Sequence, residues 1–170
     1  MDIREHMTER RKVLKYLLGS AGVLTGICVH DELDIRPFKF GSSVAPIPTR
    51  KKYVRGQPSL SAGSETTYGR IIPNEDAVED SFYTVPDSVS SELGTGFDSG
   101  FWVATLAILP NDSTFNPGPV KFRGESLKYY NAEITDSGNQ NRDLVFHYVF
   151  HHWIRTLPIY SQPSSVCIDL

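Results

Sequence analysis

Residues 101–109 form a nine-residue, largely apolar run that is rich in aromatic and branched side chains. Gly100 precedes this run and Pro110 follows it, so the segment is shorter than a typical helix, and its composition favours a β-strand. The side chains of a strand alternate between the two faces of a sheet, and here both sets are apolar. The sequence therefore predicts a central strand covered on both sides, or on one side with Trp102 against a loop.

Other segments bounded by turn residues have the composition of strands, and strands are expected at residues 81–85, 120–122, 127–135 and 144–155. Residues 87–99, which contain glycines, are expected to form a loop, and residues 136–143 a polar hairpin loop. Strands joined by turns, with no helix between them, predict a mainly β fold, one half of an antiparallel immunoglobulin-like or similar β-sandwich. The cysteine–tryptophan–cysteine spacing of antibody domains is absent, so this expectation concerns architecture alone.

The chain divides by composition into three parts. Residues 1–29 are expected to be a signal or membrane anchor, and residues 81–170 to be a β-sandwich domain. Between them, residues 30–80 contain five prolines and a polar stretch of small side chains. An extended linker with at most short edge strands is therefore expected there. The remaining length suffices for a single hydrophobic core.

Residues 8–29 have the layout of an export signal, with basic side chains ahead of a charge-free run of small and aliphatic residues. Lysine and arginine stay on the cytoplasmic side while the apolar run enters the bilayer. The run, residues 16–29, has 14 residues, whereas a helix needs roughly 20 to cross a bilayer. It is therefore expected either to be removed or to serve as a marginal anchor. The alternative is an amphipathic surface helix with a basic start.

The residues of the basic region resemble the twin-arginine export motif of secreted archaeal and bacterial proteins, and the matching positions are Arg10, Arg11, Val13, Leu14 and Lys15. The resemblance covers only the N-terminal segment. It implies recognition by the twin-arginine translocase, which carries folded proteins across the membrane, and such motifs are addresses read by a receptor. The implied location is extracytoplasmic, either secreted or anchored to the outer face of the cytoplasmic membrane.

Cys28, Cys167 and Asn111 are candidates for covalent modification. Cys28 follows the apolar run where a lipidated cysteine would lie, although Ile27 precedes it where such sites usually have a small residue. Outside the cytoplasm the two cysteines could form a disulfide, but the sequence favours no bridge because both lie towards the chain ends. Asn111 begins an Asn-Asp-Ser glycosylation sequon on an expected surface turn.

The chain carries 17 basic and 20 acidic side chains, for a net charge of −3. A mildly acidic surface repels phosphate backbones, so general nucleic-acid binding is not expected. Residues 50–55 are a basic cluster with one tyrosine, expected to be a solvated tether near anionic lipid heads; a nucleic-acid patch would need stacking residues nearby. Asp76, Glu79 and Asp80 form an acidic cluster without the spacing of a calcium loop, so a solvated turn is expected.

His147, His151 and His152 are the candidate metal ligands. On a helix, His147 and His151 would lie one turn apart on one face, which is the spacing of helical zinc sites. The neighbouring valine, tyrosine and phenylalanine residues favour a strand instead. On a strand these two histidines share a face but stand about 13 Å apart, while His152 faces the other way. The sequence therefore favours polar positions near the end of a sheet over a metal site.

Two functions are compatible with these observations. The favoured one is an exported β-sandwich, tethered or released, that binds a protein partner at the cell surface or joins a surface assembly. Motifs for a nucleophile elbow, a phosphate-binding loop or a dinucleotide are missing, and no cofactor is expected. The expected contacts are with the translocase during export and with the membrane through the N-terminus. The alternative is an exported metal- or cofactor-binding enzyme that uses His147, His151 and His152.

Overall fold

The computed structural model describes residues 37–123, 125–135, 143–157 and 160–170. These residues belong to the unit that spans residues 37–170. The predictions for residues 1–29, which include the twin-arginine motif and Cys28, lie outside the described residues. So does most of the hairpin loop expected at residues 136–143.

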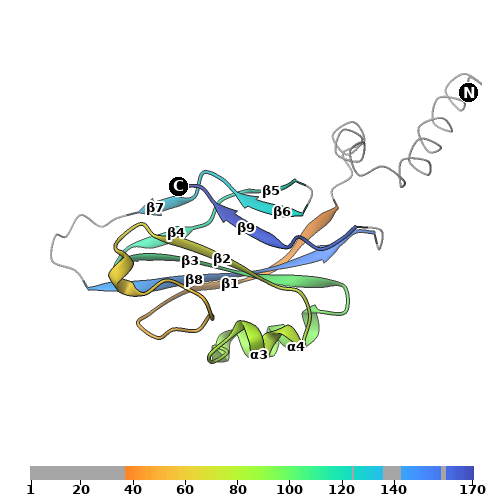
Figure 1. The fold of residues 1–170 in the computed structure, drawn as a ribbon, viewed down its shortest axis with the longest axis horizontal. Helices are drawn as coiled ribbons and strands as arrows, with labels where there is room; N and C mark the ends of the chain where they lie inside the picture. The colour runs from red at the N-terminus through yellow and green to blue at the C-terminus, as the bar shows by residue number, and fades with distance from the viewer. Residues whose placement is uncertain (1–36, 124, 136–142, 158–159) are drawn as a thin grey trace, which may run out of the picture. The chain divides into compact units, whose positions relative to one another are not determined.

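Four antiparallel strands form the main sheet, in the order β1, β8, β3, β2 (Figure 1). They are β1 (Phe38–Thr49), β8 (Leu144–Arg155), β3 (Gly100–Pro110) and β2 (Thr67–Ile72). The two central strands, β3 and β8, pair along their whole length. The edge strand β1 breaks register between Phe40 and Ser42 and again between Val44 and Ile47.

Each face of the main sheet is covered by a different layer (Figure 1). One face, here called the helix side, carries α3 (Ala77–Ser81), α4 (Asp87–Gly96) and the connection from β1 to β2, which contains the short 3-10 helix η2 (Leu60–Ala62). The other face, here called the small-sheet side, carries two small sheets. One consists of β5 (Val120–Arg123), β6 (Ser126–Tyr129) and β9 (Ser165–Ile168), the other of β4 (Thr114–Asn116) and β7 (Glu133–Thr135).

The central strand predicted at residues 101–109 is confirmed as β3. Every residue of β3 from Gly100 to Leu109 is buried. Trp102 and Ile108 belong to the core on the helix side, whereas Phe101 and Val103 belong to the core on the small-sheet side. Both faces are therefore covered. A segment that is apolar on both faces loses the most exposed apolar area at the centre of a layered sheet, which explains its position.

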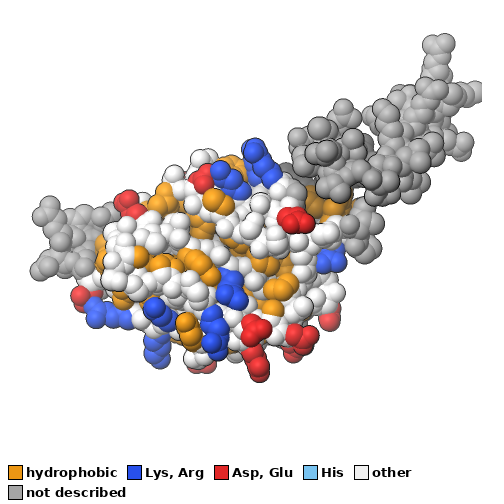
Figure 2. Space-filling view, viewed as in Figure 1, with side chains coloured by type: hydrophobic (Ala, Val, Ile, Leu, Met, Phe, Trp, Pro, Cys, Tyr) orange, Lys and Arg blue, Asp and Glu red, His pale blue; other side chains and the backbone are white. Residues whose placement is uncertain are grey.

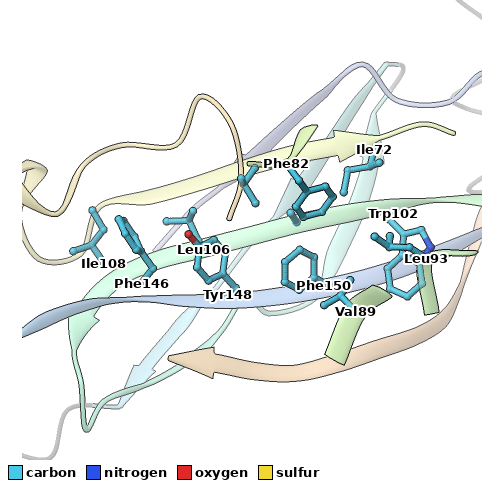
Figure 3. Close-up of a cluster of buried hydrophobic side chains, with 12 residues drawn as sticks. Ile72, Phe82, Val89, Leu93, Trp102, Leu106, Ile108, Phe146, Tyr148 and Phe150 are labelled. Atoms are coloured by element: carbon cyan, nitrogen blue, oxygen red, sulfur yellow. The ribbon is translucent and has the colours of Figure 1, made fainter. Parts of the chain in front are cut away.

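Aromatic and aliphatic side chains together fill the core on the helix side (Figure 3). Tyr148 and Phe150 project from alternate positions of β8 towards the helices. Val89 and Leu93 of α4 point towards Phe150 and Trp102 (Figure 3). Because residues four apart share one face of a helix, these two side chains bury a single stripe of α4 against the sheet. This burial stabilises a helix too short to be stable alone.

The expected extended linker at residues 30–80 is wrong for the part that the structure describes. Residues 38–49 form β1 and residues 67–72 form β2, the two edge strands of the main sheet. The prolines are compatible with this arrangement because an edge strand has one side on which a backbone donor is not needed. Pro46 also lies within the second register break of β1. The domain therefore begins near Pro37 and not near residue 81.

Three local predictions also need correction. Residues 81–85 form no strand, since Phe82 makes only a single β-bridge, to Val54. Residues 87–99 contain α4 where a loop was expected. Residues 127–135 divide between β6 and β7, which join the small sheets and do not pair with β3. The strand at residues 144–155 and the short edge strand at residues 120–122 are confirmed as β8 and β5.

The fold is mainly β: of the residues that the structure describes, 49% lie in strands and 14% in helices. Its sheets are antiparallel apart from the parallel pair of β6 and β9. An immunoglobulin-like sandwich is not confirmed, because helices cover one face of the main sheet and the opposite layer is divided into two small sheets. None of the helices within the described ranges is long and apolar enough to cross a membrane.

Candidate functional site

Three histidines lie on β8, the strand that pairs with both β1 and β3. His147 and His151 lie opposite residues of β3 that face the small-sheet side. His152 lies opposite Trp102 on the helix side, and the two rings stack with their centroids 5.0 Å apart. The predicted strand is therefore confirmed, and so is the predicted division of the histidines between its two faces.

A chain of hydrogen bonds joins His151 to β6. The indole nitrogen of Trp153 donates to the hydroxyl of Tyr129 over 3.3 Å, and this hydroxyl lies 2.8 Å from Nδ1 of His151. An indole N–H can only donate, so the Tyr129 oxygen accepts from Trp153, and the direction of its contact with Nδ1 follows the tautomer of His151. Burial lowers the pKa of His151 to about 4. Burial therefore keeps the imidazole neutral at neutral pH.

His147 and His152 are each held by a backbone carbonyl. Nε2 of His147 lies 3.0 Å from the carbonyl oxygen of Pro110, and Nε2 of His152 lies 2.7 Å from that of Gly96. A carbonyl oxygen only accepts, so both rings carry a proton on Nε2. Burial lowers the pKa of His147. The two histidines thus link β8 to the last residue of β3 and to the last residue of α4.

The three histidines do not converge on one point. Each directs a ring nitrogen at a different element, and His152 lies on the opposite side of the sheet from the other two. Within the described ranges, no three histidine, cysteine, aspartate or glutamate side chains are placed to hold one metal ion. The alternative function built on His147, His151 and His152 therefore gains no observation in its favour.

Asn111 is exposed in a turn after β3, as the sequence predicts for the sequon. Its backbone N–H donates to the carbonyl oxygen of Asp143 over 3.2 Å. Ser113, the third residue of the sequon, is only 5% exposed, and its hydroxyl oxygen is buried without a hydrogen-bond partner. The folded turn therefore presents the asparagine to solvent but not the serine hydroxyl.

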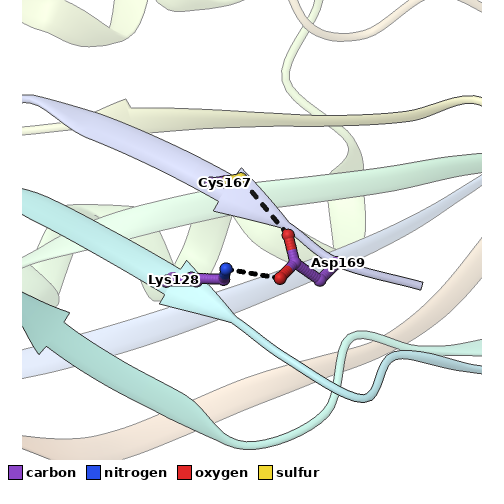
Figure 4. Close-up of polar contacts among 3 residues, drawn as sticks. All are labelled: Lys128, Cys167 and Asp169. Carbon is purple, nitrogen blue, oxygen red and sulfur yellow. Dashed lines mark hydrogen bonds and ion pairs between the residues drawn. The ribbon is translucent and has the colours of Figure 1, made fainter.

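Cys167 is exposed on β9 and forms no disulfide with any described residue (Figure 4). Its thiol donates to the carboxylate of Asp169 over 3.6 Å, and Lys128 forms an ion pair with the same carboxylate at 2.5 Å. The hydrogen bond from Lys128 lowers the pKa of Asp169. Cys28, the other cysteine, lies outside the described residues.

Comparisons with protein-family models, with curated proteins and with solved structures gave no match. The surface of the described residues is therefore the remaining guide to function.

The basic segment, residues 50–55, is anchored to the helix side of the sheet by Tyr148. The backbone N–H of Tyr53 donates to the Tyr148 hydroxyl over 3.1 Å, and this hydroxyl lies 2.6 Å from Oε1 of Gln57. Burial raises the pKa of Tyr148 to about 12, so its hydroxyl keeps its proton at neutral pH. Lys51 and Lys52 are exposed on this anchored segment. The segment is thus part of the folded surface and not the free tether that the sequence suggested.

A short backbone pairing places the basic segment beside the acidic residues of α3. The backbone N–H of Arg55 donates to Ser81, and that of Tyr83 donates to Tyr53, each over 2.8 Å. The guanidinium of Arg55 also lies over the ring of Tyr83, 5.0 Å from its centroid. Figure 2 shows the result: Lys and Arg side chains gather over the connection from β1 to β2, and Asp and Glu side chains over α3 and α4.

Two aromatic side chains are more than half exposed, Phe40 at 52% and Tyr83 at 55%. Phe40 on β1 packs edge to face against Trp153, with ring centroids 5.6 Å apart. Sequence reasoning missed both, because it assigned Phe40 to a linker and Tyr83 to a strand. No local pattern marks either residue as exposed, since the exposure follows from how distant segments pack around each ring.

Proposed function

We propose that this protein is an exported module, secreted or tethered to the membrane through its N-terminus, that binds a protein partner or joins an assembly at the cell surface. Its β-rich body acts as a sandwich in the broad sense, in which the main sheet packs against the two small sheets. The twin-arginine-like motif at Arg10 and Arg11 supports export, and the exposed aromatic residues support binding.

The observation that carries the binding role is the exposure of Phe40 and Tyr83 in a domain whose tryptophans and most of whose phenylalanines are buried. The apolar area of an exposed aromatic side chain is removed from water only when a partner covers it. Aromatic residues are enriched at the centres of protein interfaces. The two lie on different sides of the main sheet, since Phe40 contacts Trp153 on the small-sheet side and Tyr83 lies beside α3 on the helix side. The domain therefore offers two separate contact surfaces.

Cell fractionation with N-terminal sequencing tests the export part of this proposal. The native chain is expected outside the cytoplasm, and the double variant Arg10→Lys with Arg11→Lys is expected to accumulate inside, because the translocase reads the arginine pair. A matched variant, Lys39→Arg, changes a basic side chain on β1 and is expected to be exported normally. Finding the native chain free in the cytosol would refute export.

Photo-crosslinking in intact cells tests the binding part. A photoreactive amino acid at position 40 or 83 is expected to capture a discrete protein partner, whereas the same group at exposed Lys121 on β5 serves as the control. Equal capture from all three positions, or none from any, would contradict a binding surface at the two aromatic residues.

The alternative, an exported metal- or cofactor-binding enzyme, has a direct test of its own. Elemental analysis of protein purified without added metal would reverse the ranking if it found one ion per chain. In that case replacing His151 should release the ion, because His151 is one of the three histidines on which the alternative depends.

A further inference from the structure

We propose that the helix side of this domain is the interface of a two-fold symmetric dimer, with a second copy of the same chain as the occupant. The inference rests on the proposed role in assembly and names the partner. The surface concerned, here called the dipolar face, has a basic half (Lys51, Lys52 and Arg55), an acidic half (Glu75, Asp76, Glu79 and Asp80) and Tyr83 between them.

The basic half keeps its positive charge exposed. Lys51 and Lys52 are exposed, and both lie on the segment that Tyr148 anchors, so their backbone positions are defined by the core. Arg55 donates through Nε to the carbonyl oxygen of Phe82 over 2.8 Å. A carbonyl satisfies a donor without cancelling its charge, so this contact positions the guanidinium and leaves the half cationic.

The acidic half lies on and just before α3. Glu75, Asp76, Glu79 and Asp80 are all exposed. No basic residue occurs between residues 74 and 99, so their charge is not offset within the segment. Two guanidinium groups lie beside this half, and both donate to its backbone carbonyls: Arg55 to Glu79 over 3.2 Å and Arg70 of β2 to Asp80 over 3.0 Å. The carboxylates of this half therefore remain available to another molecule.

The two halves do not neutralise each other within one chain. Among the residues that the structure describes, the ion pairs join Arg50 to Asp143 and Lys128 to Asp169. Neither pair links the basic half to the acidic half. The halves lie side by side and point outward from the same side of the sheet (Figure 2).

A face with adjacent halves of opposite charge is complementary to itself after a half-turn. A two-fold axis near Tyr83 places the basic half of one copy over the acidic half of the other, and the same contact forms a second time by symmetry. Tyr83 would then meet its own copy at the centre, where aromatic residues contribute most to an interface. Because both halves of each copy are buried in this one interface, no further copy can bind and the assembly is a dimer.

Charge reversal on the full chain tests this arrangement by sedimentation velocity at low salt. Lys51→Glu with Lys52→Glu, and separately Glu75→Lys with Asp76→Lys, are each expected to raise the dimer dissociation constant at least tenfold, because each puts like charges in contact twice. An equimolar mixture of the two variants is expected to form a heterodimer, since both contacts are then attractive. The variant with all four changes is expected to dimerise with itself again.

Three controls sharpen the result. Lys121→Glu with Arg123→Glu changes two exposed residues of β5 on the small-sheet side and is expected to leave dimerisation unchanged. Tyr83→Ala is expected to weaken the dimer about tenfold, whereas Tyr83→Phe keeps the ring and most of the affinity. Raising sodium chloride from about 0.05 M to about 0.5 M should weaken the native dimer, since exposed charges are then screened. Far-ultraviolet circular dichroism verifies that every variant is folded.

Several outcomes would overturn the dimer. A native chain that stays monomeric at low salt, a mixture that fails to associate, or species larger than dimers would each refute it. Weakening by the basic reversal but not by the acidic one would refute the pairing of the basic half with the acidic half. A monomer that is still exported, and that crosslinks to another protein at position 83, would refute the dimer but not the proposed function. A dimer that is never exported would support the dimer and refute the exported role.

Discussion

Tyr129, His151 and Trp153 connect the main sheet to the small sheet that contains β6, through the hydrogen bonds described above. Nδ1 of His151 lies 2.8 Å from the Tyr129 hydroxyl, so the imidazole ring is held inside this network. Burial, which lowers the pKa of His151 to about 4, is the physical cause of its neutral state. His147, whose pKa burial also lowers, adds in the same direction.

We predict from this that acid destabilises the domain partly through His151. The pKa in the folded state lies below the unfolded value of about 6.5, so the unfolded chain binds the extra proton first. Above pH 6.5 His151 causes no loss of stability. As the pH falls towards 4, the free energy of unfolding decreases, by at most roughly 3 kcal/mol from this residue. His151→Gln keeps a polar group that can hydrogen-bond to the Tyr129 hydroxyl, and it cannot titrate. Urea midpoints at pH 7.5 and 4.5 should therefore differ less in the variant than in the native chain; equal differences would contradict the prediction.

Gly69 shows how closely two elements approach. It lies on β2, and a Cβ atom added there would come within 2.4 Å of Cγ1 of Val166 on β9. Gly69→Ala is expected to destabilise the domain by about 1–3 kcal/mol, because β9 must move away from β2. Combining it with Val166→Ala makes room for the methyl group, so the double variant should be more stable than the sum of the two changes predicts. Denaturant unfolding of all four proteins measures this coupling, and strict additivity would show that the two residues do not touch.

The turn between β3 and β4 contains the glycosylation sequon, in which Asn111 is exposed but Ser113 is buried. Because the serine of a sequon is part of what the transferase recognises, burial of Ser113 should block modification of Asn111 after folding. Purified folded protein is expected to stay unmodified in an oligosaccharyltransferase reaction that modifies a peptide of residues 107–117. In cells, a chain exported in the folded state should have an intact mass without glycan. A glycan on Asn111 would show that modification came before folding.

At the scale of the whole molecule, β1 is expected to be indispensable, because it covers one edge of the central strand β8 along most of its length. Limited proteolysis distinguishes this arrangement from the extended linker first expected at residues 30–80. The structure predicts a resistant core that retains β1 and β2, identified by N-terminal sequencing and mass. A stable fragment beginning near residue 81 would show that the earlier segment is dispensable.

The sequence by itself determined the two central strands. Residues 101–109 and 144–155 carry enough apolar side chains on both faces that only a covered, extended position buries them, and this property can be read from neighbouring residues alone. The same alternation correctly divided His147 and His151 from His152. The mainly β class follows from these strands.

The tertiary structure alone decided the partners of these strands and the composition of the surface. α4 forms because Val89 and Leu93 find a buried aromatic layer, although its glycines predict a loop. The basic segment and the acidic residues of α3 become neighbours through backbone hydrogen bonds such as that from Tyr83 to Tyr53, thirty residues apart in the chain. Such contacts depend on which distant segments meet once the core has formed, and a pattern of neighbouring residues contains no information on that choice.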